Sequence, residues 1–106
     1  MNKNDKVKKI KIIIDPEIKS FSYLFYYCEC IEFIYFKKFY RKNIIDMNNM
    51  FSYCSSIKEL NLNNVNTNNV TDMSGMFSYC SSLKDLNLKN LNTNNVTIMS
   101  SIFYEC

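Results

Sequence analysis

The stretch V-T-D-M-S-G-M-F-S-Y-C-S-S-L-K-D-L-N-L-K-N-L-N-T-N-N, residues Val70 to Asn95, decides the fold of this chain. It is one copy of a 26-residue unit, and residues 44–69 form a second copy that is identical at 18 of 26 positions. A weaker copy precedes them at residues 18–43, and residues 96–106 form the first eleven residues of a further copy. A constant period of this length indicates a repeat architecture, in which each unit packs mainly against its neighbours.

Positions separated by 26 residues share their chemistry. Nine such columns hold only apolar residues or Cys in every copy. The clearest are Phe21, Met47, Met73 and Met99; Phe25, Phe51, Phe77 and Phe103; and Cys28, Cys54, Cys80 and Cys106. We therefore expect the columns to form one continuous core through the stacked units.

The first part of the unit has the spacing of a helix. Val70, Met73, Met76, Phe77 and Cys80 follow the i, i+3, i+6, i+7, i+10 pattern of one helical face. Thr71 or Asp72 would cap the start of that helix, and Asp72 also suits the positive end of its dipole. The spacing predicts a short helix over residues 70–80.

The second part of the unit has the spacing of a strand. Leu86 and Leu88 are separated by one residue, and this period-two step predicts a short strand near residues 85–88. The loop at residues 90–95 then returns the chain to the next unit. Stacked units would place their strands in one parallel sheet. The fold class predicted from these periods is an α/β solenoid of 26-residue helix-turn-strand units, with a short parallel sheet on one side.

The chain divides into a terminus and a repeat region. Residues 1–17 are predicted to be a polar terminus followed by an N-terminal capping strand at residues 7–14, which Asp15-Pro16 ends. Residues 18–106 are predicted to be the repeat solenoid, with units at 18–43, 44–69, 70–95 and a partial unit at 96–106.

Charge and hydrophobicity limit the partners and the location. The net charge of +3 combines a basic part, residues 1–43, with an acidic part, residues 44–106. The basic part is typical of a solvated end, and also of a segment that meets an acidic membrane surface or nucleic acid. No apolar run approaches the ~20 residues of a membrane helix, so we expect no membrane span. Residues 12–14 are too short for the core of a secretory signal, and none is predicted.

The sequence predicts neither an enzyme nor a cofactor site. His is absent, which excludes catalytic triads that depend on it, and the carboxylates recur singly. The Cys column predicts buried thiols, although stacking at the ~4.8 Å strand spacing also permits disulfides. No C-x₂-C spacing supports a metal site. Cys30 lies outside the column and is the best candidate for an exposed, reactive thiol.

Two further motifs favour structural explanations. Asn69-Val70-Thr71 and Asn95-Val96-Thr97 match a glycosylation acceptor, but both recur with the repeat and suit helix capping. The stretch Ile34–Asn43 combines aromatic and basic residues, as in surfaces that bind single-stranded nucleic acid. Several of its aromatic residues fall in core columns, so we expect no nucleic-acid partner.

The repeat resembles a known family of surface proteins. The L-x-x-L-x-L spacing at residues 83–88 looks like the strand segment of leucine-rich repeats. The longer pattern N-V-T-D-M-S-G-M-F-S-Y-C-S-S-L at residues 69–83 resembles the BspA-like leucine-rich-repeat surface proteins. This resemblance implies a leucine-rich-repeat-like solenoid, a role in adhesion or protein binding, and a location at the cell surface or outside the cell. Leu91 occupies the usual place of the leucine-rich-repeat Asn, which argues against a conventional Asn ladder.

The outward positions of the strands are the predicted binding surface. They combine aromatic, acidic and amide side chains, which suit a protein partner. The candidate residues are Phe33, Tyr35, Glu59, Asn61, Asp85 and Asn87. As an alternative, Phe33 and Tyr35 cover the open end of the stack. A second hypothesis is a structural fragment of a longer repeat array that associates end to end through its uncapped C-terminal end.

Overall fold

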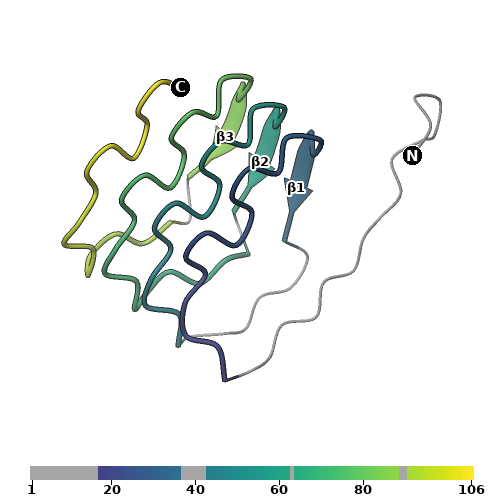
Figure 1. The fold of residues 1–106 in the computed structure, drawn as a ribbon. Coiled ribbons are helices and arrows are strands. Elements are labelled where there is room, and N and C mark those ends of the chain that lie inside the picture. The colour runs from purple at the N-terminus through teal and green to yellow at the C-terminus, as the bar shows by residue number, and fades with distance from the viewer. Residues whose placement is uncertain (1–16, 37–42, 63, 89–90) are drawn as a thin grey trace.

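Neighbouring repeat units lie side by side and in register. The computed structural model describes residues 17–36, 43–62, 64–88 and 91–106. Within them lie three strands, namely β1 (Phe33–Tyr35), β2 (Glu59–Asn61) and β3 (Asp85–Asn87). They form a parallel sheet in the order β1-β2-β3, and paired residues are 26 positions apart (Figure 1). The strands occur at the positions of the period-two step, whereas the capping strand predicted at residues 7–14 lies outside the described residues.

The helix predicted over residues 70–80 is wrong. Residues 74–79 form consecutive turns, and the described part of the chain contains no helix. The backbone φ angle is positive at Gly75 (62°) and at Tyr79 (59°), in the left-handed region. The N–H of Met76 donates to the carbonyl of Met73, and that of Cys80 to the carbonyl of Phe77. A positive φ at the third residue of a four-residue turn is characteristic of type II turns, and both of these turns have it.

The turn segments of successive units form a second ladder of hydrogen bonds. We call residues 20–28, 46–54, 72–80 and 98–106 the turn ladder. Alternate N–H groups donate to the carbonyl 25 residues further on, in the next unit. Examples are Phe51 to Met76 and Phe77 to Ile102, both at 3.0 Å. The units at 18–43, 44–69 and 70–95 are therefore bonded to one another on two sides, through the sheet and through the turn ladder.

This second ladder explains why a helix does not form. A helix uses its N–H groups internally and is about 10 Å wide with its side chains. Parallel strands are only ~4.8 Å apart, so units that follow the sheet spacing on both sides have no room for helices. Asp72, predicted as a helix cap, instead accepts hydrogen bonds from the backbone N–H and the hydroxyl of Ser74, at 2.9 and 2.7 Å. It therefore stabilises a turn.

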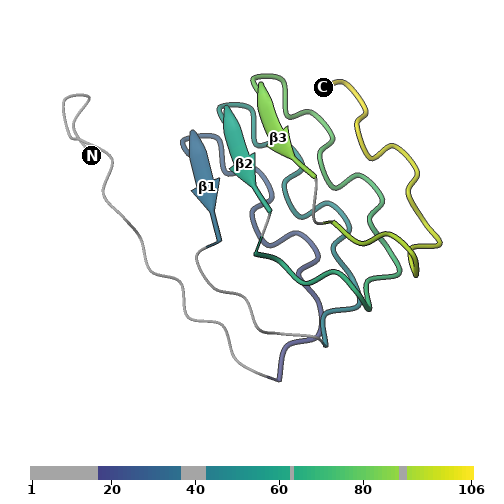
Figure 2. The same ribbon diagram turned by 180° about the vertical axis from the view of Figure 1, so that it is seen from behind.

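The core lies between the sheet and the turn ladder, which follow separate sides of the stacked units (Figures 1 and 2). The Met and Phe columns are fully buried in the middle units. Phe51 stacks on Phe25 with ring centroids 5.5 Å apart, and on Phe77 at 6.0 Å. Leu91 packs against this core, as its column partner Val65 does within it. The repeat columns identified the core even though the helix was wrong.

Candidate functional site

The sheet register brings together the candidate residues of the three strands. Phe33 pairs with Glu59, which pairs with Asp85. In the second row, Tyr35 pairs with Asn61, which pairs with Asn87. Because side chains two residues apart in a strand share a face, the side chains of Phe33, Tyr35, Glu59, Asn61 and Asp85 belong to one face of the sheet. We call this surface the strand face.

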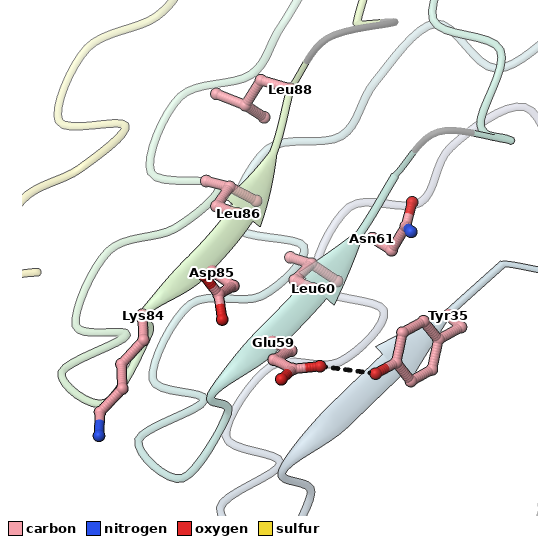
Figure 3. Close-up of a pocket in the computed structure, with 8 residues that line it drawn as sticks. All are labelled: Tyr35, Glu59, Leu60, Asn61, Lys84, Asp85, Leu86 and Leu88. Carbon is pink, nitrogen blue, oxygen red and sulfur yellow. Dashed lines mark hydrogen bonds between the residues drawn. The ribbon is translucent and has the colours of Figure 1, made fainter.

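The centre of the strand face is a shallow hollow beside Tyr35. The Tyr35 hydroxyl donates a hydrogen bond of 2.7 Å to Oε2 of Glu59, and Asp85 lies next to Glu59 (Figure 3). The hydrogen bond to Glu59, followed by desolvation and the nearby carboxylates, raises the pKa of Tyr35. Tyr35 and Phe33 remain 61% and 43% exposed. The strand face thus offers apolar rings next to an oriented carboxylate.

The charges around this hollow are mixed, with the carboxylates at its centre. Glu59 and Asp85 carry negative charge, while Lys84 lines the hollow from its edge (Figure 3). Lys58 pairs with Glu32 at 3.2 Å, and both side chains are about half exposed. Exposed pairs of this kind contribute little stability. Aromatic rings next to carboxylates are chemically complementary to an apolar group beside a cation.

The Cys column forms a row of protonated thiols. All five cysteines are free. The thiol of Cys54 donates to the carbonyl of Phe25 at 3.1 Å, and that of Cys80 donates to the carbonyl of Phe51 at the same distance. Burial raises the pKa of Cys54 to about 11 and that of Cys80 to about 12, and neighbouring thiols add to the effect. These thiols are poor nucleophiles. Cys30 is exposed, as predicted.

The described residues contain no group of three or more His, Cys, Asp or Glu side chains that could hold a metal ion. In the same part of the chain, no helix is long and apolar enough to cross a membrane. Most of the aromatic and basic stretch at 34–43 lies outside the described residues. The hydroxyls of Thr71 and Thr97 donate to the carbonyls of Ile45 and Thr71, so they link neighbouring units and cap no helix.

The sequence columns did not identify one partly exposed feature, a stack of three tyrosines. The rings of Tyr27 and Tyr53 are 4.3 Å apart and nearly parallel, and those of Tyr53 and Tyr79 are 4.4 Å apart. We call these three residues the tyrosine ladder. All three have a positive φ near 60°, which is unfavourable for a bulky side chain. The signal in the sequence is the Tyr-Cys pair that ends the first three turn segments, at 27–28, 53–54 and 79–80.

A known protein family matches the repeat region of this chain. The family model described as "Mycoplasma protein of unknown function, DUF285" matches residues 19–106. The chain belongs to this family. The DUF285 match starts one residue after the first 26-residue unit begins, so it covers the repeat region. No curated protein and no solved structure matches the chain significantly.

Proposed function

We propose that this chain is a non-enzymatic, protein-binding module of the BspA-like, leucine-rich-repeat type. Its units would form a solenoid in which turn segments take the place of helices. The DUF285 match over the repeats and the in-register pairing of β1, β2 and β3 support this architecture. Repeat arrays of this kind present extended surfaces to other macromolecules. A cell-surface location follows from the resemblance and is part of the same proposal.

One observation carries the protein-binding role, namely the exposed aromatic side chains beside a carboxylate on the strand face. Phe33 and Tyr35 are exposed, and Tyr35 is held by Glu59. Aromatic residues that are fixed before binding lose little conformational freedom in a complex, and they are frequent at binding hot spots. A partner with an apolar side chain next to Lys or Arg would meet both the rings and the carboxylates.

Replacing both Phe33 and Tyr35 with Ser is expected to weaken binding by more than about tenfold, because hot-spot side chains contribute above 1–2 kcal/mol. The measurement is the affinity of peptides selected against the wild-type chain from a phage-displayed library. Ile45→Ser is the matched control, since Ile45 is exposed and its column holds Lys19, Thr71 and Thr97. Equal binding by the double variant and the control would remove the strand face as the site.

A further inference from the structure

The middle ring of the tyrosine ladder, Tyr53, offers a ligand its edge and neither of its faces. Tyr53 is stacked on both sides, by Tyr27 and by Tyr79. A ligand that stacks on an aromatic face, such as a nucleobase or a sugar ring, therefore finds both faces of Tyr53 occupied. The edges of aromatic rings carry partial positive charge and attract the face of another ring in a T-shaped contact.

The chain itself places rings against this ladder at both ends. The ring of Tyr26 lies edge-to-face with Tyr27 at 4.6 Å and 90°, and with Tyr53 at 5.7 Å and 86°. At the other end, the ring of Tyr104 makes a similar contact with Tyr79 at 5.5 Å and 73°. Tyr26 and Tyr104 occupy one column of the repeat.

Between these two tyrosines, the same column holds Ser52 and Ser78. The small side chains leave a hollow of about 340 Å³, near the lower end of the range for ligand sites. Its lining is uncharged and consists of Asn49, Ser52, Tyr53, Ser74, Gly75, Ser78, Tyr79, Ser100, Ser101 and Tyr104. Residue 75 is Gly, so no side chain from this position fills the hollow. A Cβ at this position would overlap Oδ1 of Asn49.

We propose that this hollow binds an aromatic side chain of a partner protein. The incoming ring would stand edge-to-face with Tyr53 and Tyr79, as Tyr26 does with Tyr27 and Tyr53. The hydroxyl of Ser78 donates to the carbonyl of Ser101 at 2.6 Å, and its oxygen can still accept from a phenol or an indole N–H. The hydroxyl of Ser52 and the amide of Asn49 line the same hollow. Tyr, Ser, Asn and Gly are also the residues that dominate antibody paratopes, where rigid tyrosines and small polar residues bind protein surfaces.

The uncharged lining favours a ring over a charged side chain as the occupant. No Lys, Arg, Asp or Glu lines the hollow, so a charged group of the partner would lose its hydration without gaining an ion pair. This site lies on the turn ladder and shares no residue with the strand face. It therefore stands independently of the protein-binding role proposed for that face.

The test uses N-acetyl-tryptophanamide as the probe and N-acetyl-leucinamide as its apolar counterpart. In a chain labelled with ¹³C at tyrosine, the ring signals of Tyr53 and Tyr79 should shift with the tryptophan probe, with a dissociation constant in the millimolar range expected for one side chain. The signals of Tyr35 should not move. Equal shifts with the leucine probe, or no shifts with the tryptophan probe, would overturn the proposal.

Ser52→Tyr is the decisive variant, because it places in the hollow the residue that Tyr26 supplies in the first unit. It should abolish the shifts of Tyr53 and Tyr79, whereas Ser52→Ala, which fills nothing, should retain them. If Ser52→Tyr fails to fold, Tyr79→Leu removes one wall and should weaken binding about two- to tenfold, the factor for a single edge-to-face pair. Wild-type affinity in the folded Ser52→Tyr variant, or in Tyr79→Leu, would contradict the site.

Discussion

Replacing Phe51 with Ala is expected to lower the free energy of unfolding by about 3–5 kcal/mol. Phe51 is fully buried and lies in the middle of the Phe column. It is nearly coplanar with Phe25 and Phe77, at interplanar angles of 5° and 2°. The substitution therefore removes ring contacts to two units at once. Because backbone bonds on both sides hold each unit at a fixed spacing, the neighbours cannot close the cavity easily.

The chain offers a matched control in the same column. Phe103 stacks on Phe77 at 5.4 Å, but it is 48% exposed. Phe103→Ala should therefore lower the free energy of unfolding by less than about 1 kcal/mol, in line with other surface substitutions. Urea denaturation followed by circular dichroism measures both values. Similar losses for the two variants would mean that the buried Phe stack does not hold the units together.

The positions of the core and of the strands followed from the 26-residue period. A column that is apolar in every unit has to face the interior of a repeat stack, and Met73 and Phe77 are buried as this requires. The L-x-L step placed the strand at residues 85–88, and β3 covers Asp85–Asn87. The same columns gave the register, because equivalent residues of neighbouring units pair. Glu59 and Asp85 could thus be assigned to one face before the structure was known.

The local conformation of the turn segments could not be read from the same pattern. Met73, Met76, Phe77 and Cys80 have helical spacing, but consecutive four-residue turns bring the same residues to the core. The choice depends on the N–H groups, which donate to the next unit and not within a helix. The spacing of apolar residues does not indicate which carbonyl accepts from each backbone N–H group. The tyrosine ladder did not follow from the columns, because Tyr79 is only partly buried and its column ends in Glu105, so that column is not apolar in every unit.

The second large effect concerns the buried thiols, which are expected to make the fold sensitive to alkaline pH. In the unfolded chain Cys has a pKa of about 8.5, whereas burial raises the pKa of Cys54 to about 11 and that of Cys80 to about 12. Above pH 9 the unfolded state therefore binds fewer protons than the folded state, and the free energy of unfolding falls as pH rises. The stabilisation is complete below the unfolded pKa and is lost toward the folded values.

The loss should amount to about 1 kcal/mol per thiol at pH 10, a figure that allows for solvent screening. Urea denaturation between pH 8 and pH 10 measures it. The pH range ends at 10, near the ordinary pKa of tyrosine. Above that pH, the stability also depends on Tyr27 and Tyr79, because their pKa values are raised in the folded chain. The double variant Cys54→Ala and Cys80→Ala should have a lower stability at pH 8, but a flatter dependence on pH.

Cys30→Ala is the control for this experiment, because Cys30 is exposed and lies outside the column. It should keep the wild-type slope between pH 8 and pH 10. Alkylation gives an independent readout, since iodoacetamide reacts with the thiolate. In the folded chain at pH 8 it should modify Cys30 well before Cys54 or Cys80. Two results would contradict this prediction: rapid modification of Cys80 under native conditions, or a pH slope in the double variant as steep as that of the wild type. Either would show that Cys54 and Cys80 do not hold their protons as their burial and their bonds to the Phe carbonyls require.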